Sequence, residues 1–144
     1  MFRWALESQV HVNAKPKEVW DAWADVPSWS KWDSCTKTFS LEKPFCSNST
    51  GYRKAIGCFS SPISVLFAEQ GKRFCMKARF FGAKVIYNYS VLPWWDEKVR
   101  VVQHIEASGF FAPLLWAIAG RKWKKRLPES MKNFSTFVES RSVD

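Results

Sequence analysis

The sequence predicts an α+β protein in which a run of antiparallel strands is covered by one long helix near the C-terminus. Three observations indicate this fold class. The chain opens with an alternating segment, continues into about seventy residues of strand-like segments separated by turn residues, and closes with an amphipathic segment from Ala112 to Val138. Strands that follow one another without an intervening helix favour antiparallel pairing. The expected order is strand, two short helices, six strands and a long helix.

The first strand and the two short helices follow from local patterns. Residues Phe2 to Val12 alternate between apolar and polar side chains, a period of two that is typical of a half-buried strand. Pro16 suits the first position of a helix, because its missing N–H would have no partner there. The segment Lys17 to Asp25 is therefore predicted as a short amphipathic helix. A second short helix is predicted from Pro27 to Trp32, since the residue before a proline avoids helical angles and ends the first helix.

The pattern changes to strands from Thr36 onward. Turn-forming glycine, proline, serine and asparagine residues separate the strand-like segments. The six candidates are Thr36–Glu42, Gly51–Phe59, Ile63–Glu69, Arg73–Phe81, Lys84–Leu92 and Lys98–Ser108. Alternation within each segment predicts which side chains face the covering helix.

The final helix has one apolar stripe and one basic face. At 3.6 residues per turn, the stripe consists of Trp116, Gly120, Trp123, Leu127, Met131, Phe134 and Val138. Pro128 lies within this helix and frees the carbonyl group of Lys124, so a kink or a split is expected there.

Composition limits the class of protein. At 144 residues the chain is expected to form a single domain, residues 1–144. Nine Trp, twelve Phe and three Tyr are enough large rings to fill a core or to line an apolar pocket. The four cysteines have no CxxC spacing and only two histidines are present, so we expect no metal site and no cofactor. Neither a membrane-spanning run nor a signal peptide is readable, which predicts a cytoplasmic protein.

The net charge of +9 raises nucleic acid and anionic membranes as partners. The basic block from Arg121 to Arg126 carries five Lys or Arg residues, more than half of this excess, and is most simply the solvated back of the final helix. No nucleic-acid-reading motif accompanies it, so no nucleic-acid partner is expected. Weak contact with an anionic membrane surface through Lys124 and Lys125 is kept as a further hypothesis.

Two stretches carry a resemblance to a known family. Residues Asn13 to Asp33 contain an Asn-Ala-x-x-x-x-Val-Trp helix start followed by a short Trp-x-x-Trp-Asp helix. They resemble the opening of the polyketide cyclase/dehydrase group within the START-like superfamily, also called SRPBCC. The segment Ser108 to Leu115 and the basic helix after it are similar to the family's ending, so the resemblance extends from about Phe2 to Glu139.

The resemblance implies a helix-grip fold. In this fold a curved seven-stranded antiparallel sheet wraps around a long C-terminal helix, two short helices follow the first strand, and a deep cavity lies between sheet and helix. Members of the superfamily bind lipids, sterols, polyketides, hormones or quinone-like molecules, and some catalyse cyclisation or aromatisation. Their catalytic residues differ between branches, so the resemblance carries over the place of the cavity and no catalytic residue.

The candidate ligand-binding residues combine strand alternation with this implied cavity. An ordinary core role is the alternative for each apolar residue, while buried polar groups would orient a mostly apolar ligand. The candidates are Trp23, Trp32, Tyr52, Phe67, Phe74, Met76, Tyr87, Tyr89, Gln103, Trp116 and Trp123.

The favoured function is binding or carriage of a small hydrophobic ligand, such as a lipid, a polyketide or another aromatic or isoprenoid-like molecule. A polyketide cyclase/aromatase-like enzyme that uses the same cavity is the first alternative, and a protein- or membrane-surface interaction module is the second. No catalytic motif is readable, because His11 and His104 are predicted on the outer face and Asp33 is expected to support local hydrogen bonds. Orientation of a flexible chain can still accelerate a cyclisation, so the enzyme question and the oligomeric state stay open.

Overall fold

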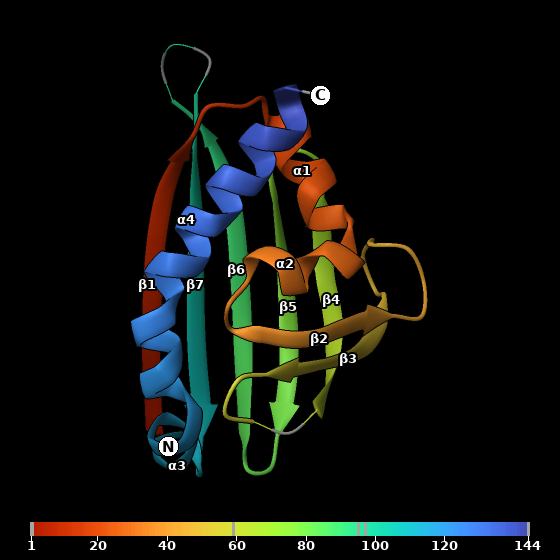
Figure 1. Cartoon of the computed structure of the whole chain (residues 1–144). Helices are drawn as coiled ribbons and strands as arrows, with labels where there is room; N and C mark the ends of the chain where they lie inside the picture. Colours follow the sequence, from red (N-terminus) through yellow and green to blue (C-terminus); the bar gives the residue numbers. More distant parts are fainter. Residues whose placement is uncertain (1, 59, 95, 97, 144) are drawn as a thin grey trace.

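A computed structural model describes residues 2–58, 60–94, 96 and 98–143. Of residues 142 and 143 only the backbone is described. The described residues form one seven-stranded antiparallel sheet with the strand order β1-β7-β6-β5-β4-β3-β2 (Figure 1). Its strands are β1 (Phe2–Val12), β2 (Thr36–Leu41), β3 (Thr50–Ala55), β4 (Ser60–Glu69), β5 (Arg73–Phe80), β6 (Ala83–Pro93) and β7 (Val99–Gly109). The predicted fold class is confirmed in order and in topology.

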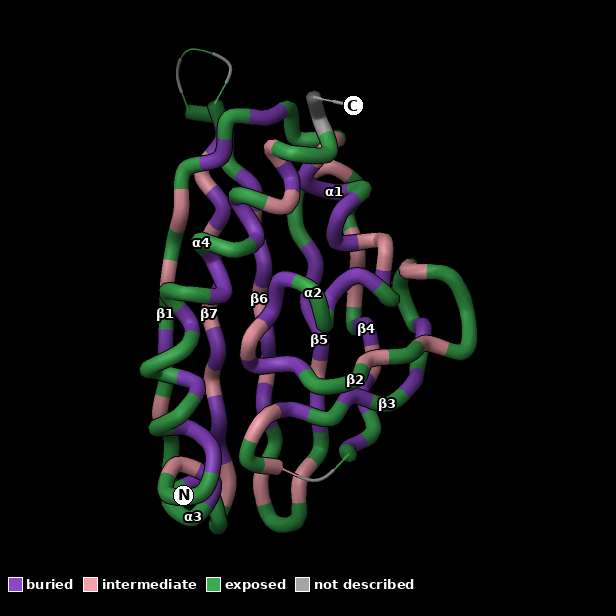
Figure 2. The backbone as a smooth tube through the Cα atoms, viewed as in Figure 1, coloured by how far each residue is buried: buried purple, intermediate pink, exposed green. Residues whose placement is uncertain are grey.

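The helices cover one face of this sheet. They are α1 (Pro16–Ala24), the 3-10 turn η1 (Val26–Ser28), α2 (Trp29–Trp32), α3 (Ala112–Leu115), the π-helical segment η2 (Trp116–Gly120) and α4 (Arg121–Val143). Helix α4 runs along β1 and β7 at one edge of the sheet, while α1 and α2 cover the same face nearer to the opposite edge (Figure 1). The backbone is buried mainly where these helices face the sheet (Figure 2). None of the helices among the described residues combines the length and the apolar character that a bilayer crossing requires.

The ends of the chain are joined by hydrogen bonds between β1 and the C-terminal helices. Trp4 Nε1 donates to the carbonyl oxygen of Ala112 at 2.8 Å. At the other end of β1, the backbone N–H of Asn13 donates to Glu139 Oε1 at 2.9 Å. These bonds fix the long helix along the sheet at both of its ends.

The final helix differs from the expectation in where it is interrupted. Helix α4 continues through Pro128, whereas the α-helical pattern changes to a π-helix at η2, close to the start. Lys124 and Pro128 are both exposed, so water can satisfy the carbonyl group that the proline leaves without a partner. The strand predicted from Gly51 to Phe59 ends at Ala55, and Phe59 itself lies outside the described residues.

Two side chains lie on the opposite face from the one predicted. Tyr52 is 56% exposed, because the inward positions of β3 are Gly51, Arg53 and Ala55. Phe67 is paired with Cys75 after a β-bulge between Val65 and Phe67, and Cys75 alternates with the inward-facing side chains of its own strand. One extra residue in a strand reverses the faces beyond it, which is why simple alternation misplaced Phe67.

Candidate functional site

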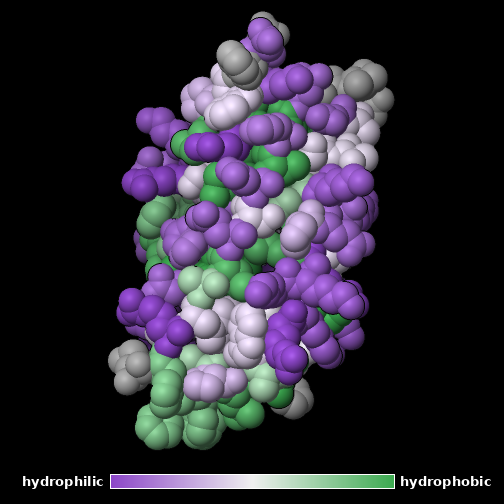
Figure 3. Space-filling view, turned by 90° about the vertical axis from the view of Figure 1, so that its left-hand side faces the viewer, coloured by the Kyte–Doolittle hydropathy of each residue, from purple (hydrophilic) through white to green (hydrophobic). Residues whose placement is uncertain are grey.

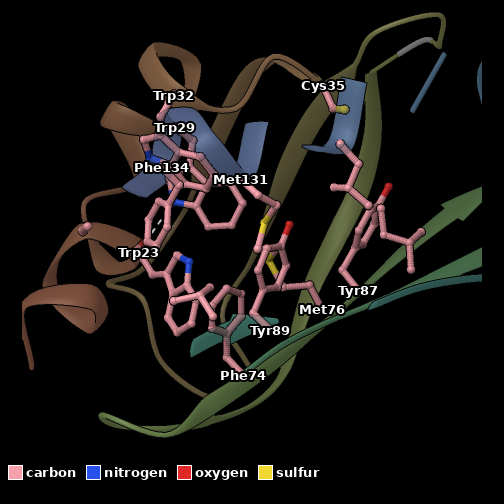
Figure 4. Packing of buried hydrophobic residues seen from close by; sticks show 14 of the residues in the cluster. Trp23, Trp29, Trp32, Cys35, Phe74, Met76, Tyr87, Tyr89, Met131 and Phe134 are labelled. Atoms are coloured by element: carbon pink, nitrogen blue, oxygen red, sulfur yellow. Dashed lines mark hydrogen bonds between the residues drawn. The ribbon is translucent and has the colours of Figure 1, made fainter. Parts of the chain in front are cut away.

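The space between sheet and helices is filled by aromatic rings. Trp23 of α1 stacks on Phe134 of α4 with ring centroids 5.6 Å apart, and Phe134 meets Trp32 edge-on at 4.5 Å. Below them Phe74 and Tyr89 stack at 4.5 Å, and all five side chains are buried. Figure 4 shows these rings packed against one another under α1, α2 and α4. Side chains, rather than open space, occupy this part of the interior.

Most of the candidate residues come together in this interior. Eight of them are buried between the sheet and the helices: Trp23, Trp32, Phe74, Met76, Tyr87, Tyr89, Gln103 and Trp123. Trp116 is half-buried and packs edge-on against Trp4 at 5.2 Å. Tyr52 and Phe67 lie on the other face of the sheet and are not part of this group. A ligand-contacting role for these residues stays a prediction.

A buried ion pair that the sequence did not indicate lies at the centre of the helix-covered face. Arg53 Nη2 of β3 donates to Asp33 Oδ2 at 3.2 Å, and both side chains are at most 3% exposed. Asp33 also accepts hydrogen bonds from the Thr36 and Ser130 hydroxyls, each at 2.7 Å. The carboxylate therefore connects the end of α2, the start of β2, strand β3 and helix α4. A charge so deeply buried is tolerated only with this degree of pairing.

The prediction that Asp33 supports hydrogen bonds is confirmed, and its partners are more distant than expected. The backbone N–H of Cys35, two residues further on, donates to Asp33 Oδ1 at 3.0 Å, while Ser130 is 97 residues away in sequence. Arg53 was missed because a positively charged residue in a strand normally marks the solvent face. The alternation of Gly51, Arg53 and Ala55 against Tyr52 and Lys54 was the available signal.

Three polar side chains face the interior near this ion pair. Gln103 Nε2 donates to the Tyr89 hydroxyl at 2.7 Å. The guanidinium of Arg53 lies over the Tyr87 ring, 4.8 Å from its centroid, and the Tyr87 hydroxyl is buried without a hydrogen-bond partner among the described residues. Burial raises the pKa of Tyr87 to about 12, although the positive charge of Arg53 opposes that rise. Both phenols are therefore neutral hydrogen-bonding groups near pH 7.

The thiols of Cys35, which is buried, and Cys58, which is half-buried, are poorly suited to act as nucleophiles. Burial, together with the negative charge of Asp33, raises the pKa of Cys35 to about 12. Burial likewise raises the pKa of Cys58 to about 11. A thiolate is the reactive form of cysteine, so neither thiol is activated at neutral pH. Among the described residues, no three His, Cys, Asp or Glu side chains converge in a way that could hold a metal ion.

An apolar pocket opens at the end of the molecule where α3 lies. We call it the end pocket; its lining residues are Cys58, Phe80, Phe81, Ala83, Phe111, Leu114, Leu115 and Ile118. They come from the β5–β6 hairpin, from the loop after β3 and from the start of the C-terminal helical region. The volume of about 160 Å³ is close to that of a cavity that binds benzene, so one small ring or a branched alkyl end fits.

One layer of aromatic side chains separates the end pocket from the buried polar groups. Phe80 lines the pocket, and its ring centroid lies 6.3 Å from that of Trp123. The ring of Trp123 is in turn 6.3 Å from the ring of Tyr87. Trp123 is held in place by a hydrogen bond from its Nε1 to the Ile56 carbonyl oxygen at 3.0 Å. A ligand was expected against Trp123, whereas a pocket on the far side of that ring was not predicted.

Comparison with known proteins gives matches of fold. No protein-family model and no curated protein matches the sequence. The structure is similar to the ZhuI aromatase/cyclase from Streptomyces sp. R1128, with a TM-score of 0.75, 11% identity, and coverage of 98% of this chain and 96% of that one. A START superfamily protein from Mycobacterium smegmatis gives a TM-score of 0.69 at 14% identity, covering 94% of this chain and 97% of that one.

A plant enzyme has the same fold. Norcoclaurine synthase from Thalictrum flavum, in complex with dopamine and hydroxybenzaldehyde, gives a TM-score of 0.72 at 8% identity, and the match covers 96% of this chain and 88% of that one. All three similarities extend over nearly the whole of both chains. Together with the strand order and the long covering helix, they show that this chain has the helix-grip fold of the START-like proteins.

Proposed function

We propose that the protein binds a small hydrophobic ligand as a single START-like domain, and that the end pocket is where the ligand is held. The main support for this proposal is that the lining of the pocket consists entirely of aromatic, aliphatic and thiol side chains. Apolar concave sites of this kind are the usual place for apolar ligands. The ligand class is a lipid, a polyketide or another aromatic or isoprenoid-like molecule. Of these, a ring or a branched chain end fits the volume, and the rest of a longer molecule would extend outward.

The fold neighbours support this class of ligand. One is an aromatase/cyclase, and another holds two small aromatic molecules in its structure. In this chain aromatic rings occupy the middle of the helix-covered face, so the proposed contact surface lies at the end of the molecule. We propose further that the protein acts in the cytoplasm, as a binder or carrier of such a ligand.

The test is a binding titration with N-phenyl-1-naphthylamine, a neutral apolar probe whose fluorescence rises in an apolar site. Ala83→Phe places a ring inside the end pocket and is expected to weaken binding by about tenfold or more. Ala117→Phe is the matched control, because Ala117 is exposed and does not line the pocket. Equal binding by Ala83→Phe and the unaltered protein would show that the probe binds elsewhere. Native mass spectrometry of the freshly purified protein, followed by organic extraction, would then identify any natural ligand.

A cyclase/aromatase-like activity is the second candidate, and one observation favours it. Tyr89 and Gln103 form a buried hydrogen-bonded pair, and the nearby Tyr87 hydroxyl has no partner among the described residues. Such groups could position a polyketide-like substrate that displaced Trp123. Turnover of such a substrate should then fall sharply on Tyr87→Phe or Gln103→Leu. Unchanged turnover in both variants would remove the interior from consideration as the site.

A further inference from the structure

Six large apolar side chains are exposed together around the end pocket. We call them the apolar end: Phe2, Phe81, Phe110, Phe111, Leu114 and Ile118, with exposed fractions between 37% and 91%. Single exposed apolar residues are normal on a protein surface, whereas a contiguous group marks a contact site. Figure 3 shows a broad hydrophobic surface at this end of the molecule, whereas hydrophilic side chains with smaller hydrophobic areas between them cover the rest of that face.

The rings of the apolar end contact one another across three segments of the chain. Phe81 stacks on Phe111 at 5.6 Å, Phe111 meets Phe110 edge-on at 5.6 Å, and Phe110 meets Phe2 at 6.5 Å. Phe81 is 91% exposed although it lies in the β5–β6 turn itself, where small polar residues are usual. These contacts hold the rings as one fixed surface.

The backbone beneath this surface is shaped to hold Phe111. Gly82 has a φ of +69°, and the N–H of Phe111 donates to the Gly82 carbonyl oxygen at 2.9 Å. A Cβ atom on Gly82 would lie 2.0 Å from Phe111 Cδ2. The turn of the hairpin therefore accommodates the Phe111 ring, which remains 37% exposed.

Two of the segments that build the apolar end are basic along their length, although Lys72 and Arg73 lie at the far end of the β5–β6 hairpin. Residues 70–94, which include the β5–β6 hairpin, carry five Lys or Arg and no Asp or Glu. Residues 107–128, from the end of β7 into α4, also carry five Lys or Arg and no acidic residue. Lys84 on β6 and Lys122 in the first turn of α4 are both exposed next to the apolar end.

We propose that the apolar end docks on a membrane that contains anionic phospholipids. The exposed rings and aliphatic side chains would enter the boundary between headgroups and acyl chains, and Lys84 and Lys122 would lie among the phosphates. Aromatic residues prefer this interfacial layer, and basic residues beside them are attracted by its negative potential. A stable protein–protein interface needs about 800 Å² on each partner, which is large for six side chains. The membrane is therefore the partner that this surface fits.

Docking extends the proposed function without depending on it. Phe81, Phe111, Leu114 and Ile118 belong to both the end pocket and the apolar end. A docked protein would open its pocket directly into the apolar layer, so an apolar molecule could transfer without crossing water. Vesicle binding and probe binding are measured separately, so the failure of one proposal would not be mistaken for the failure of the other.

The experiment is flotation with vesicles of phosphatidylcholine alone and of phosphatidylcholine mixed with phosphatidylglycerol. The unaltered protein should float with the mixed vesicles and much less with the neutral ones. Phe81→Ser with Phe110→Ser should lower the partition coefficient by about tenfold or more. Tyr52→Ser with Leu66→Ser, which removes two exposed apolar side chains from β3 and β4, should leave it unchanged.

Two double variants with the same change in net charge distinguish the effect of the lysines beside the apolar end from the effect of the overall charge. Lys84→Glu with Lys122→Glu should also weaken binding by about tenfold or more. Lys31→Glu with Lys43→Glu changes the net charge equally at exposed sites on α2 and after β2, and should have little effect. Equal loss in both charge variants would overturn the proposal, because overall attraction would then suffice. The proposal would also be overturned if the unaltered protein did not bind the mixed vesicles, or if the double phenylalanine variant bound them as well as the unaltered protein does.

Discussion

At the scale of single residues, Asp33 and Arg53 hold the helix-covered face together. Four donors converge on one carboxylate: the Cys35 N–H, the Thr36 and Ser130 hydroxyls and Arg53 Nη2. The Arg53 side chain also donates from Nε to the Thr36 hydroxyl at 2.9 Å. These bonds connect segments that are far apart in sequence, so the pair fixes the position of α4 over the β2–β3 hairpin.

Removal of one member of this pair should be far more costly than removal of an exposed ion pair. Asp33→Leu leaves the Arg53 charge buried and alone, and is expected to lower the free energy of unfolding by about 3–5 kcal/mol. The double variant Asp33→Leu with Arg53→Met should lose less, because no buried charge remains. Both are measured by urea unfolding.

The control is the exposed pair between Arg141 and Asp25, which is 3.1 Å long with both side chains more than 40% exposed. Arg141→Leu should cost about 0–1 kcal/mol in the same measurement. If Asp33→Leu cost no more than Arg141→Leu, the buried pair would have no structural role.

At the scale of elements, the positions of strands and helices along the chain were predicted more completely than the side of the sheet on which each side chain lies. Strand β1 was predicted at its observed bounds, because eleven residues of clean alternation have no competing pattern. Phe67 was misplaced by a bulge, which depends on the pairing with β5 and leaves no mark in the sequence of β4 itself. The π-helical segment η2 was missed for a similar reason, since an apolar stripe does not reveal one extra residue in a turn.

The β5–β6 turn offers a test of how tightly this end is built. Gly82 and Gly71 both have a positive φ, +69° and +77°, so alanine at either position is strained by about 1–2 kcal/mol. A Cβ on Gly71 meets nothing within 4 Å, whereas one on Gly82 would overlap the Phe111 ring. Gly82→Ala should therefore destabilise the protein more than Gly71→Ala in thermal or urea unfolding. Equal losses would mean that Phe111 is free to move away from the hairpin.

At the scale of the whole molecule, the sequence predicted the architecture but not whether its interior is hollow. Most of the aromatic candidates lie between sheet and helix as expected, with Tyr52 and Phe67 as exceptions, yet their packing depends on three-dimensional register. Trp23, Trp32 and Phe134 come from three different helices. The ring centroid of Phe134 lies 5.6 Å from that of Trp23 and 4.5 Å from that of Trp32. No periodicity contains that information. The end pocket was missed likewise, because its lining combines residues from distant segments.

Trp123→Ala tests how this packing limits the pocket. It removes the ring between Phe80 and Tyr87, so the end pocket should extend inward and bind N-phenyl-1-naphthylamine more tightly. The cost in stability should be about 3–5 kcal/mol, and saturating probe should restore part of it. Phe134→Ala is the control, since it removes a buried ring of the same cluster that does not adjoin the pocket. If both variants gained affinity equally, the probe would be filling any available cavity.

The strand order also has a consequence for folding during synthesis on the ribosome. Strand β1 has its sheet partner in β7, so Phe2 pairs with Gly109 and Val12 with Val99. Strand β1 is therefore synthesised almost a hundred residues before the strand that pairs with its backbone groups. Contacts so distant in sequence form slowly and leave apolar segments uncovered in the meantime. While the residues between β1 and β7 are synthesised, the nascent chain carries an unpaired, tryptophan-containing strand that is accessible to a chaperone.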